Sequence, residues 1–365
     1  MIKRMIITAL LLFISAFFIG IIFHVSVQMG RKPKGERLQR ILKSENYKKG
    51  IFENKQETNM DRPPIEGIKE MMKKKADQRP SSPINTLPID KIRYENSVSD
   101  TTLITWLGHS TLLIRMNNLT IITDPVFSQR ASLFQNLGPK KFDYSHEYTL
   151  EELPEIDVVV ISHDHYDHLD YEAIRYLRSR VKKFITPLGV GAHLEHWGVD
   201  SAKIEEYDWW ESANIAGVKF TATPGRHFTG RLFADRFKTL WCGWAIVAGN
   251  EKLYFSGDSG YFDGFKVIGE RLGPFDFSFV ECGQYSKYWP YIHMMPEESV
   301  QAALDVKSKR AMPIHWGKFK LSIHTWFEPP TRFIKEADEK GLEVATPKIG
   351  QTFTLDEFPV EEWWN

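Results

Sequence analysis

The chain contains 365 residues, of which 42% are hydrophobic and 26% charged, proportions typical of a globular protein with one large domain and an appendage. Its 47 basic and 47 acidic residues give a formal net charge of zero, so we expect no nucleic-acid partner, which would require a basic surface. The two cysteines, Cys242 and Cys282, are too few for a disulfide framework. Both lie in apolar stretches, which indicates buried free thiols.

An apolar run occupies residues 5–27 near the N-terminus. A helix needs about 20 apolar residues to cross a bilayer, so residues 1–30 are predicted to be a single-pass membrane anchor. The alternative is a cleaved signal peptide, but the run is longer than the core of such a peptide and no Ala-x-Ala pattern follows it. Basic residues flank the run on both sides, which leaves open the side of the membrane on which the remaining chain lies.

The segment that follows, residues 31–93, is polar, contains several prolines and shows little hydrophobic periodicity. This composition is typical of a linker or of an arm that lies on a domain surface, with a short helix predicted around residues 65–75. The character of the sequence changes near Tyr94, where short β-rich stretches begin. We therefore place a single globular domain at residues 94–365.

Strands and helices are mixed along this domain. Residues 101–107, 111–116 and 119–123 are predicted strands, and the Asn-Asn pair between the last two is a hairpin-turn pattern because Asn tolerates positive φ. Further on, the sequence predicts a hairpin over residues 239–248 and 251–256, and helices over residues 169–180, 296–307 and 330–340. This mixture favours an α+β fold in which helices cover a sheet-based sandwich.

The most informative stretch is Ser-His-Asp-His-Tyr-Asp-His at residues 162–168, which directly follows the apolar run 157–161. The end of a predicted strand thus carries four potential metal ligands, His163, His165, Asp167 and His168. Imidazole and carboxylate ligands without a thiolate suit zinc and its borderline neighbours. A His-rich surface loop is the alternative, and the position directly after a strand disfavours it.

Three further polar side chains come at or just past the end of an apolar run: His227, Asp258 and His315. A sheet can present all three at one edge, where they would join the ligands of the loop. Each of them alone is more simply a polar loop residue. Together with the loop, however, they predict a metal site.

The His-x-His-x-Asp-His pattern of residues 163–168 resembles the metallo-β-lactamase superfamily. This resemblance implies an αββα sandwich and a site with two Zn²⁺ ions, with Mn²⁺ or Fe²⁺ as alternatives. It also implies that His163, His165 and His227 hold one metal. Asp167, His168 and His315 would hold the other, and Asp258 would bridge the two. A hydroxide shared by the metals would then be the nucleophile.

Longer stretches outside the ligands are also distinctive. They include Thr-Trp-Leu-Gly-His-Ser-Thr at 105–111 and Thr-Asp-Pro-Val-Phe-Ser-Gln-Arg-Ala-Ser at 123–132, with shorter pieces at 138–141, 240–244, 257–261, 273–276 and 314–317. These stretches resemble N-acylphosphatidylethanolamine-hydrolysing phospholipase D over roughly residues 100–330, which excludes the anchor. The resemblance implies a zinc phosphodiesterase that releases phosphatidic acid and an N-acylethanolamine from a phospholipid.

Within that resemblance, His293 matches a histidine near the active site. It would bind the phosphate or protonate the leaving oxygen, and a helix-cap role is the alternative. Asp167, Asp258 and His293 are the predicted catalytic residues. Asp124 would support the metal ligands rather than bind metal, whereas His109 has no predicted role.

The resulting prediction is a membrane-anchored, zinc-dependent phosphodiesterase of phospholipase D type. Residues 284–291 follow the family pattern only loosely, so the acyl-chain and headgroup selectivity stays open. The alternative enzyme is a metal-dependent lactonase or a phosphodiesterase with a soluble substrate. A non-enzymatic membrane scaffold is disfavoured because all seven ligands are intact. A homodimer is compatible with the sequence, which does not itself indicate one.

Overall fold

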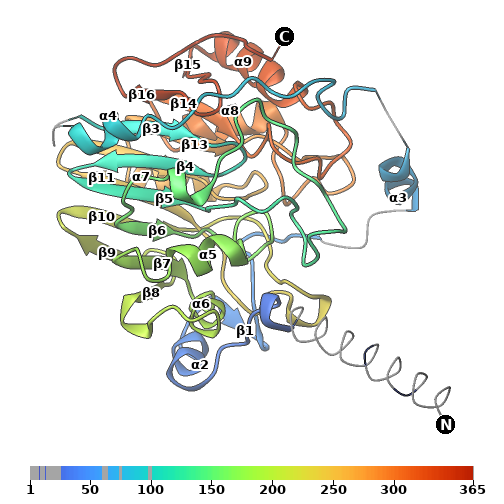
Figure 1. Ribbon diagram of the computed structural model, residues 1–365, viewed down its shortest axis with the longest axis vertical. Coiled ribbons are helices and arrows are strands. Elements are labelled where there is room, and N and C mark those ends of the chain that lie inside the picture. The colour runs from blue at the N-terminus through green and yellow to red at the C-terminus, as the bar shows by residue number, and fades with distance from the viewer. Residues whose placement is uncertain are drawn as a thin grey trace.

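Two mixed β-sheets of seven strands each form the body of the molecule (Figure 1). The computed structural model of the protein describes residues 26–59, 65–73, 76–97 and 101–364, together with Thr8 and Phe13. Helices lie on the outer sides of the two sheets, so the order of layers is helix, sheet, sheet, helix. This arrangement confirms the predicted sandwich.

The first sheet joins antiparallel strands to parallel ones. Its order is β16 (Thr352–Thr354), β3 (Leu103–Trp106), β4 (Leu112–Met116), β5 (Leu119–Thr123), β6 (Val158–Val160), β7 (Lys183–Pro187) and β8 (Ile204–Tyr207). Pairing is antiparallel from β16 to β5 and parallel from β5 to β8. The predicted turn between β4 and β5 is confirmed, because Asn117 and Asn118 have φ values of 47° and 64°.

The second sheet is built in the same way. Its order is β15 (Glu343–Val344), β14 (Arg310–Ile314), β13 (Phe277–Glu281), β12 (Glu251–Phe255), β11 (Gly243–Ala248), β10 (Val218–Thr223) and β9 (Ser212–Ile215). Pairing is parallel from β15 to β12 and antiparallel from β12 to β9. Strands β10, β12 and β14 therefore run in one direction, and their carboxyl ends meet at one edge of the sheet.

Apolar side chains form two buried clusters. The larger cluster joins both sheets with helices α5 (Tyr171–Leu177) and α6 (Gly191–His196), and its members include Ile104, Ile121, Ile174, Leu194, Phe220, Trp244 and Phe279. The smaller cluster joins the second sheet with α7 (Gly264–Arg271), α8 (Pro296–Asp305) and α9 (Glu328–Lys340), and its members include Tyr254, Phe265, Val300 and Phe333. Cys242 and Cys282 are buried free thiols, as predicted.

The predicted helices form with small shifts in their bounds. Helix α5 begins after Asp170, whose side chain accepts a hydrogen bond from the Glu172 N–H (3.0 Å). Helix α9 begins at Glu328, two residues before the predicted start, since Pro329 and Pro330 fit the first turn, where a missing N–H costs little. It ends at Gly341, whose φ of 70° is the left-handed conformation that glycine favours.

The segment 31–93 forms more structure than its composition indicates. Its described part contains α2 (Gly35–Leu42), the hairpin of β1 (Tyr47–Lys48) and β2 (Ile51–Phe52), α3 (Ile65–Met72) and the start of α4 (Lys91–Asn96). Ile41 and Phe52 belong to the larger apolar cluster. Hydrophobic periodicity misses this docking because the contacts are made by short, isolated apolar pairs, Ile41-Leu42 and Ile51-Phe52, in an otherwise polar stretch. We call residues 26–59 the arm.

The predicted membrane-spanning helix over residues 5–27 lies almost entirely outside the described residues. Among the residues that are described, no helix combines the length and the apolar character needed to cross a bilayer.

Candidate metal centre

The loop of residues 162–168 leaves β6 beside the carboxylate of Asp124, which follows the parallel neighbour β5. Asp124 is fully buried and accepts hydrogen bonds from the Ser162 N–H (2.7 Å) and the Ser162 hydroxyl (2.6 Å). A third contact joins its Oδ2 to Nδ1 of His168 (2.7 Å). Asp124 therefore fixes both ends of the loop, which is the supporting role that the sequence predicts.

Three imidazoles form a first group of potential ligands. The donor atoms of His163, His165 and His227 lie within 4.8 Å of one another. His165 Nδ1 is 2.9 Å from His163 Nε2 and 3.3 Å from His227 Nε2. Because β10 ends at the edge that faces the loop, His227 joins two residues 62 and 64 positions earlier in the sequence. These are the side chains predicted to hold one metal.

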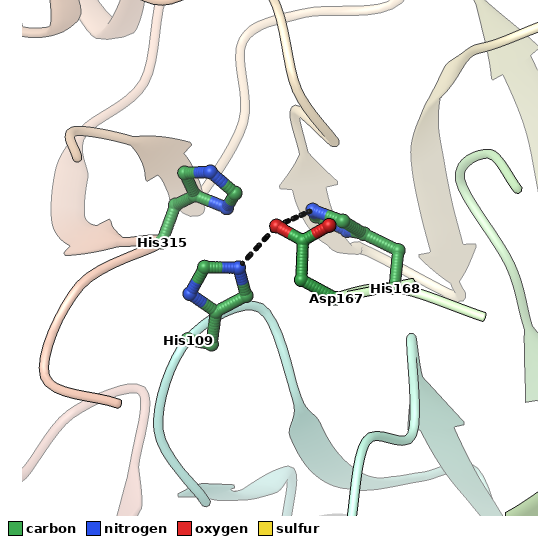
Figure 2. Close-up of side chains that lie close together, drawn as sticks. All are labelled: His109, Asp167, His168 and His315. Atoms are coloured by element: carbon green, nitrogen blue, oxygen red, sulfur yellow. Dashed lines mark hydrogen bonds and ion pairs between the residues drawn. The ribbon is translucent and has the colours of Figure 1, made fainter. Parts of the chain in front are cut away.

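A second group contains the three side chains predicted to hold the other metal and one that was given no role. Figure 2 shows Asp167, His168, His315 and His109 turned toward a common space. Asp167 Oδ2 is 2.9 Å from His109 Nε2 and 3.5 Å from His168 Nε2. His109 thus lies at the centre, either to orient Asp167 or to offer a further nitrogen.

Asp258 lies between the two groups. Its Oδ2 is 3.2 Å from His168 Nε2, 3.7 Å from His227 Nε2 and 3.8 Å from His163 Nε2. Its Oδ1 is 3.1 Å from Nδ1 of His315. One carboxylate therefore contacts members of both groups, as a bridging ligand must.

The second nitrogen of several imidazoles is held by a neighbouring oxygen. His163 Nδ1 is 2.9 Å from the Ser162 hydroxyl, and His227 Nδ1 is 2.8 Å from the Ile292 carbonyl. With Asp124 on His168, these contacts leave the Nε2 atoms directed at the centre. Such oxygen partners set the tautomer and the ring orientation of metal-binding histidines.

The residues present fit a pair of divalent cations. His168 Nε2, His315 Nε2 and Asp258 Oδ1 are buried and make no hydrogen bond with the described part of the chain, and the close contacts of His168 Nε2 and Asp258 Oδ1 given above are with other predicted ligands. Leaving such atoms unpaired costs about 1–3 kcal/mol each, so clusters of them are rare unless another group binds there. A set of imidazole nitrogens and carboxylate oxygens is the kind that zinc, manganese and iron bind.

Protonation also favours cation binding. Burial lowers the pKa of His163, His227 and His315 well below the usual range of histidine, and it lowers the pKa of His165 to about 4. These imidazoles are therefore neutral at pH 7, which is the form that binds a metal. Burial has the same effect on His168, but Asp258 and Asp167 outweigh it and raise its pKa. A cation bound at His168 would displace the proton that this raised pKa implies.

Three non-glycine residues at the centre adopt positive φ: Asp124 (35°), His109 (56°) and His315 (68°). Two of them interlock, since the His315 N–H donates to the His109 carbonyl (2.9 Å) and the His109 N–H donates to the Trp316 carbonyl (3.0 Å). Such backbone conformations cost on the order of 1–3 kcal/mol each and concentrate at functional sites.

The arm contributes a contact that the sequence did not indicate. The Asn54 amide donates to the His227 carbonyl (2.8 Å) and accepts from the His227 N–H (3.0 Å). This two-point pairing fixes the backbone of a predicted ligand. Nearby, Arg231 donates to the Gln28 carbonyl of the arm and to the Asp164 carbonyl of the metal loop (2.9 Å).

His293 lies beside the centre and is held by a residue that the sequence reasoning missed. Its Nδ1 is 3.2 Å from Oε1 of Glu281, a fully buried carboxyl group at the end of β13. His293 also groups with His227 and Asp258, with one donor atom of each within 4.8 Å of the others. Glu281 shares one property with the predicted ligands, because it ends an apolar strand, and that signal was available in the sequence.

Access to the centre is one-sided. The side chains of Asp167 and His293 are each 13% exposed, whereas those of His168, Asp258 and His315 are at most 2% exposed. Asp167 and His293, with the partly buried His165, therefore border the exposed side of the centre. The assignment of individual residues to individual metals stays a prediction, although the structure brings all seven predicted ligands together.

Comparison with known proteins identifies the family. A family model described as "Beta-lactamase superfamily domain" matches residues 120–316. The chain belongs to the metallo-β-lactamase superfamily. With its clustered histidine and aspartate side chains, it is a metal-dependent hydrolase of that fold.

Some relatives of this chain have names that state an activity, and others do not. An uncharacterized protein of Mycobacterium tuberculosis is 39% identical over 330 residues, which is 88% of this chain and 87% of that protein. The N-acyl-phosphatidylethanolamine-hydrolyzing phospholipase D 1 of Caenorhabditis elegans is 34% identical over 73% of this chain and 80% of that protein. The metallo hydrolase Igni18 of Ignicoccus hospitalis has the same fold (TM-score 0.54, 21% identity, 70% of this chain and 98% of that chain).

Proposed function

We propose that the protein is a membrane-anchored, zinc-dependent phosphodiesterase of phospholipase D type. Its substrates would be N-acylphosphatidylethanolamine-like phospholipids, which it would hydrolyse to phosphatidic acid and N-acylethanolamine. The observation that carries the proposal is the 34% identity with a phospholipase D of that specificity, over 80% of the relative's length. The likeness extends well beyond the metal ligands.

The geometry of the centre supports phosphodiester chemistry. Two divalent cations held there would polarise a phosphoryl oxygen and lower the pKa of water toward neutrality. The carboxylate of Asp258, which lies between the two groups of ligands, would offset the two positive charges. His293 and Asp167 border the exposed side, where the phosphate of a substrate would arrive.

We propose that residues 5–27 anchor the protein in a membrane, so that the substrate and the enzyme share one surface. The apolar run supports this proposal. The residue that follows the run is also linked to the metal loop through a side chain far away in the sequence. Gln28, the residue after the run, is bound through its carbonyl by Arg231, which also contacts the metal loop. A fixed exit would hold the centre at a constant distance from the lipid.

The test is turnover of N-acylphosphatidylethanolamine in mixed micelles by the purified, zinc-loaded protein. We expect the wild type to release phosphatidic acid and Asp258→Asn to release none. Asp263→Asn is the matched control, since the Asp263 side chain is 81% exposed and contacts only Lys266 among the described ion pairs. Two bound metals per chain with cleavage of lactones or soluble phosphodiesters instead would refute the lipid substrate and retain the hydrolase.

A further inference from the structure

A cavity of about 950 Å³ lies between the start of the arm and helix α6. One wall is formed by residues 31–40, which include most of α2, and the other by α6 and the chain that leads into β8. Figure 1 shows α2 beside α6 at the end of the molecule where the arm begins. None of the predicted metal ligands lines this cavity, so the proposed hydrolysis does not account for it.

The lining carries a surplus of positive charge. It contains five basic side chains, of which Arg37 and Arg40 form ion pairs with glutamates of the domain. The other three are exposed and, within the described part of the chain, form no ion pair: Arg31, Lys32 and Lys34. Two of the three acidic side chains in the lining are the partners of Arg37, which leaves Glu36 alone to offset three cations.

The backbone that carries these cations is fixed where the apolar run ends. The Val27 carbonyl accepts hydrogen bonds from the Trp197 indole N–H (2.7 Å) and from the Gly30 N–H (3.1 Å). The Arg31 N–H donates to Nδ1 of His193 on α6 (3.0 Å). Gly30 has a φ of 79°, and a Cβ atom there would overlap the His193 ring, so only glycine permits this approach. The cavity therefore has a set position relative to the end of the run.

This position indicates what binds in the cavity. Arg31 follows Val27 by four residues, which span at most about 14 Å of chain. The headgroup layer on each side of the hydrocarbon core of a bilayer is about 5–8 Å deep. Basic side chains so close to an inserted segment meet lipid phosphates, and anionic lipids attract them. A free phosphate compound would meet the same charges, but only a lipid headgroup is kept beside the cavity by the anchor.

We propose that this cavity binds the headgroup of an anionic phospholipid in the leaflet that surrounds the anchor. The inference rests on the proposed anchor and adds a lipid partner to it. A lipid bound there is not in position for hydrolysis, because the metal ligands lie elsewhere. Three cations bind a membrane weakly by themselves, so the cavity acts together with the anchor. It also adjoins the metal loop, since His193 Nε2 is 3.3 Å from Oδ2 of Asp164.

The test counts the lipids bound to full-length, zinc-loaded protein by native mass spectrometry from detergent micelles. The micelles contain phosphatidylglycerol and phosphatidylcholine in equal amounts and with the same acyl chains, so the lipids differ only in their headgroups. We expect the wild type to retain one phosphatidylglycerol in preference to phosphatidylcholine. The triple variant Arg31→Gln, Lys32→Gln, Lys34→Gln should lower this preference by about 100-fold, because each cation contributes roughly fivefold.

The matched control is a second triple variant with the same change in net charge. It replaces by Gln three exposed lysines that do not line the cavity: Lys219, Lys307 and Lys335. We expect this variant to keep the preference for phosphatidylglycerol. An equal loss in both triple variants would show that the preference comes from the charge of the whole protein, which would overturn the proposal. A wild type that retains both lipids equally would overturn it as well.

Inorganic phosphate separates a lipid headgroup from a free phosphate compound. We expect millimolar inorganic phosphate, added to the micelles, to leave the bound phosphatidylglycerol in place. Its displacement would identify a soluble ligand and refute the lipid assignment.

Failure of the proposed function gives a different pattern. The measurement involves no turnover, so its outcome does not depend on which substrate the protein cleaves. The intact mass in the same spectra shows whether the purified chain retains residues 1–27. A shortened chain that keeps the preference would refute the anchor and retain the cavity as a lipid site. A full-length chain without the preference would retain the anchor and refute the cavity.

Discussion

At the scale of single residues, the centre depends on side chains that are not predicted metal ligands themselves. Asp124 is the clearest of these, because it contacts both Ser162 and His168 from a fully buried position. It follows the end of β5, just as the ligands follow the ends of other strands. The same strand edge thus supplies the metal-binding atoms and the groups that orient them.

We expect Asp124→Asn to weaken metal binding by about 10–100-fold while the protein stays folded. The amide is close in shape to the carboxylate, but its NH₂ group cannot accept the hydrogen bonds of both Ser162 and His168. The measurement is the zinc dissociation constant from competition with a chromophoric chelator, with circular dichroism as the check on folding. An unchanged dissociation constant would show that His168 is oriented without Asp124.

A second residue, Lys318, predicts a pH dependence of stability. It is 4% exposed, and its ammonium group donates to the Val126 carbonyl (2.6 Å). Burial lowers its pKa from 10.5 to about 7. Between these two values the unfolded chain holds a proton that the folded protein has lost, so the free energy of unfolding rises with pH in that window. Below pH 7 the cost of the buried charge is complete.

We therefore expect the wild type to gain stability relative to Lys318→Met as the pH rises from 7 to 9. The difference in the free energy of unfolding should change by about 2–3 kcal/mol over these two pH units, since each unit contributes at most 1.36 kcal/mol. Denaturant unfolding of both proteins at each pH provides the measurement. The lost hydrogen bond contributes a constant offset, so a difference that does not vary with pH would refute the buried, neutral lysine.

At the scale of elements, the strand ends were predictable and the arm was not. The hairpin at Asn117-Asn118 and the ligands after β10, β12 and β14 follow from local patterns that a short window contains. The pairing of Asn54 with His227 and the contact of Glu281 with His293 join residues that have no local relation. The position of His109 beside Asp167 likewise depends on how two strands align.

Asn54→Ala tests whether the arm belongs to the centre. It removes both hydrogen bonds to the His227 backbone, so we expect the zinc affinity to fall about tenfold, the low end of the effect of an orienting residue. Asn117→Ala is the comparison, since its amide donates to a backbone carbonyl in a turn remote from the metal ligands. Equal zinc affinity of the wild type and Asn54→Ala would show that the arm only covers the domain.

At the scale of the whole molecule, the arm links the centre to the chain that precedes it. Arg231 joins the Gln28 carbonyl to the metal loop, and Arg37 forms an ion pair with Glu206 of β8. The arm is thus attached to the domain at several points along its length. The orientation of the centre toward a membrane would follow from these contacts rather than from a flexible tether.

Deletion of residues 1–25 separates anchoring from catalysis, because it leaves the whole arm in place. We expect the shortened protein no longer to sediment with membranes. Its kcat on micellar substrate should stay within a factor of about two of that of the full-length protein. Flotation of both forms with lipid vesicles and assay in detergent micelles provide the measurements. Membrane binding that survives the deletion would place the lipid contact elsewhere in the chain.

The pairing of Asn54 with His227 also has a consequence for biosynthesis. The ribosome makes Asn54 173 residues before its partner. At about 5–20 residues per second, roughly 10–35 s pass before His227 exists. The arm is therefore made before the domain, yet Asn54 can reach its place only after His227 has been made. We expect the metal to enter only after the polypeptide is nearly complete, because the His227 backbone is fixed only once it pairs with Asn54 and the last predicted ligand, His315, is made later still.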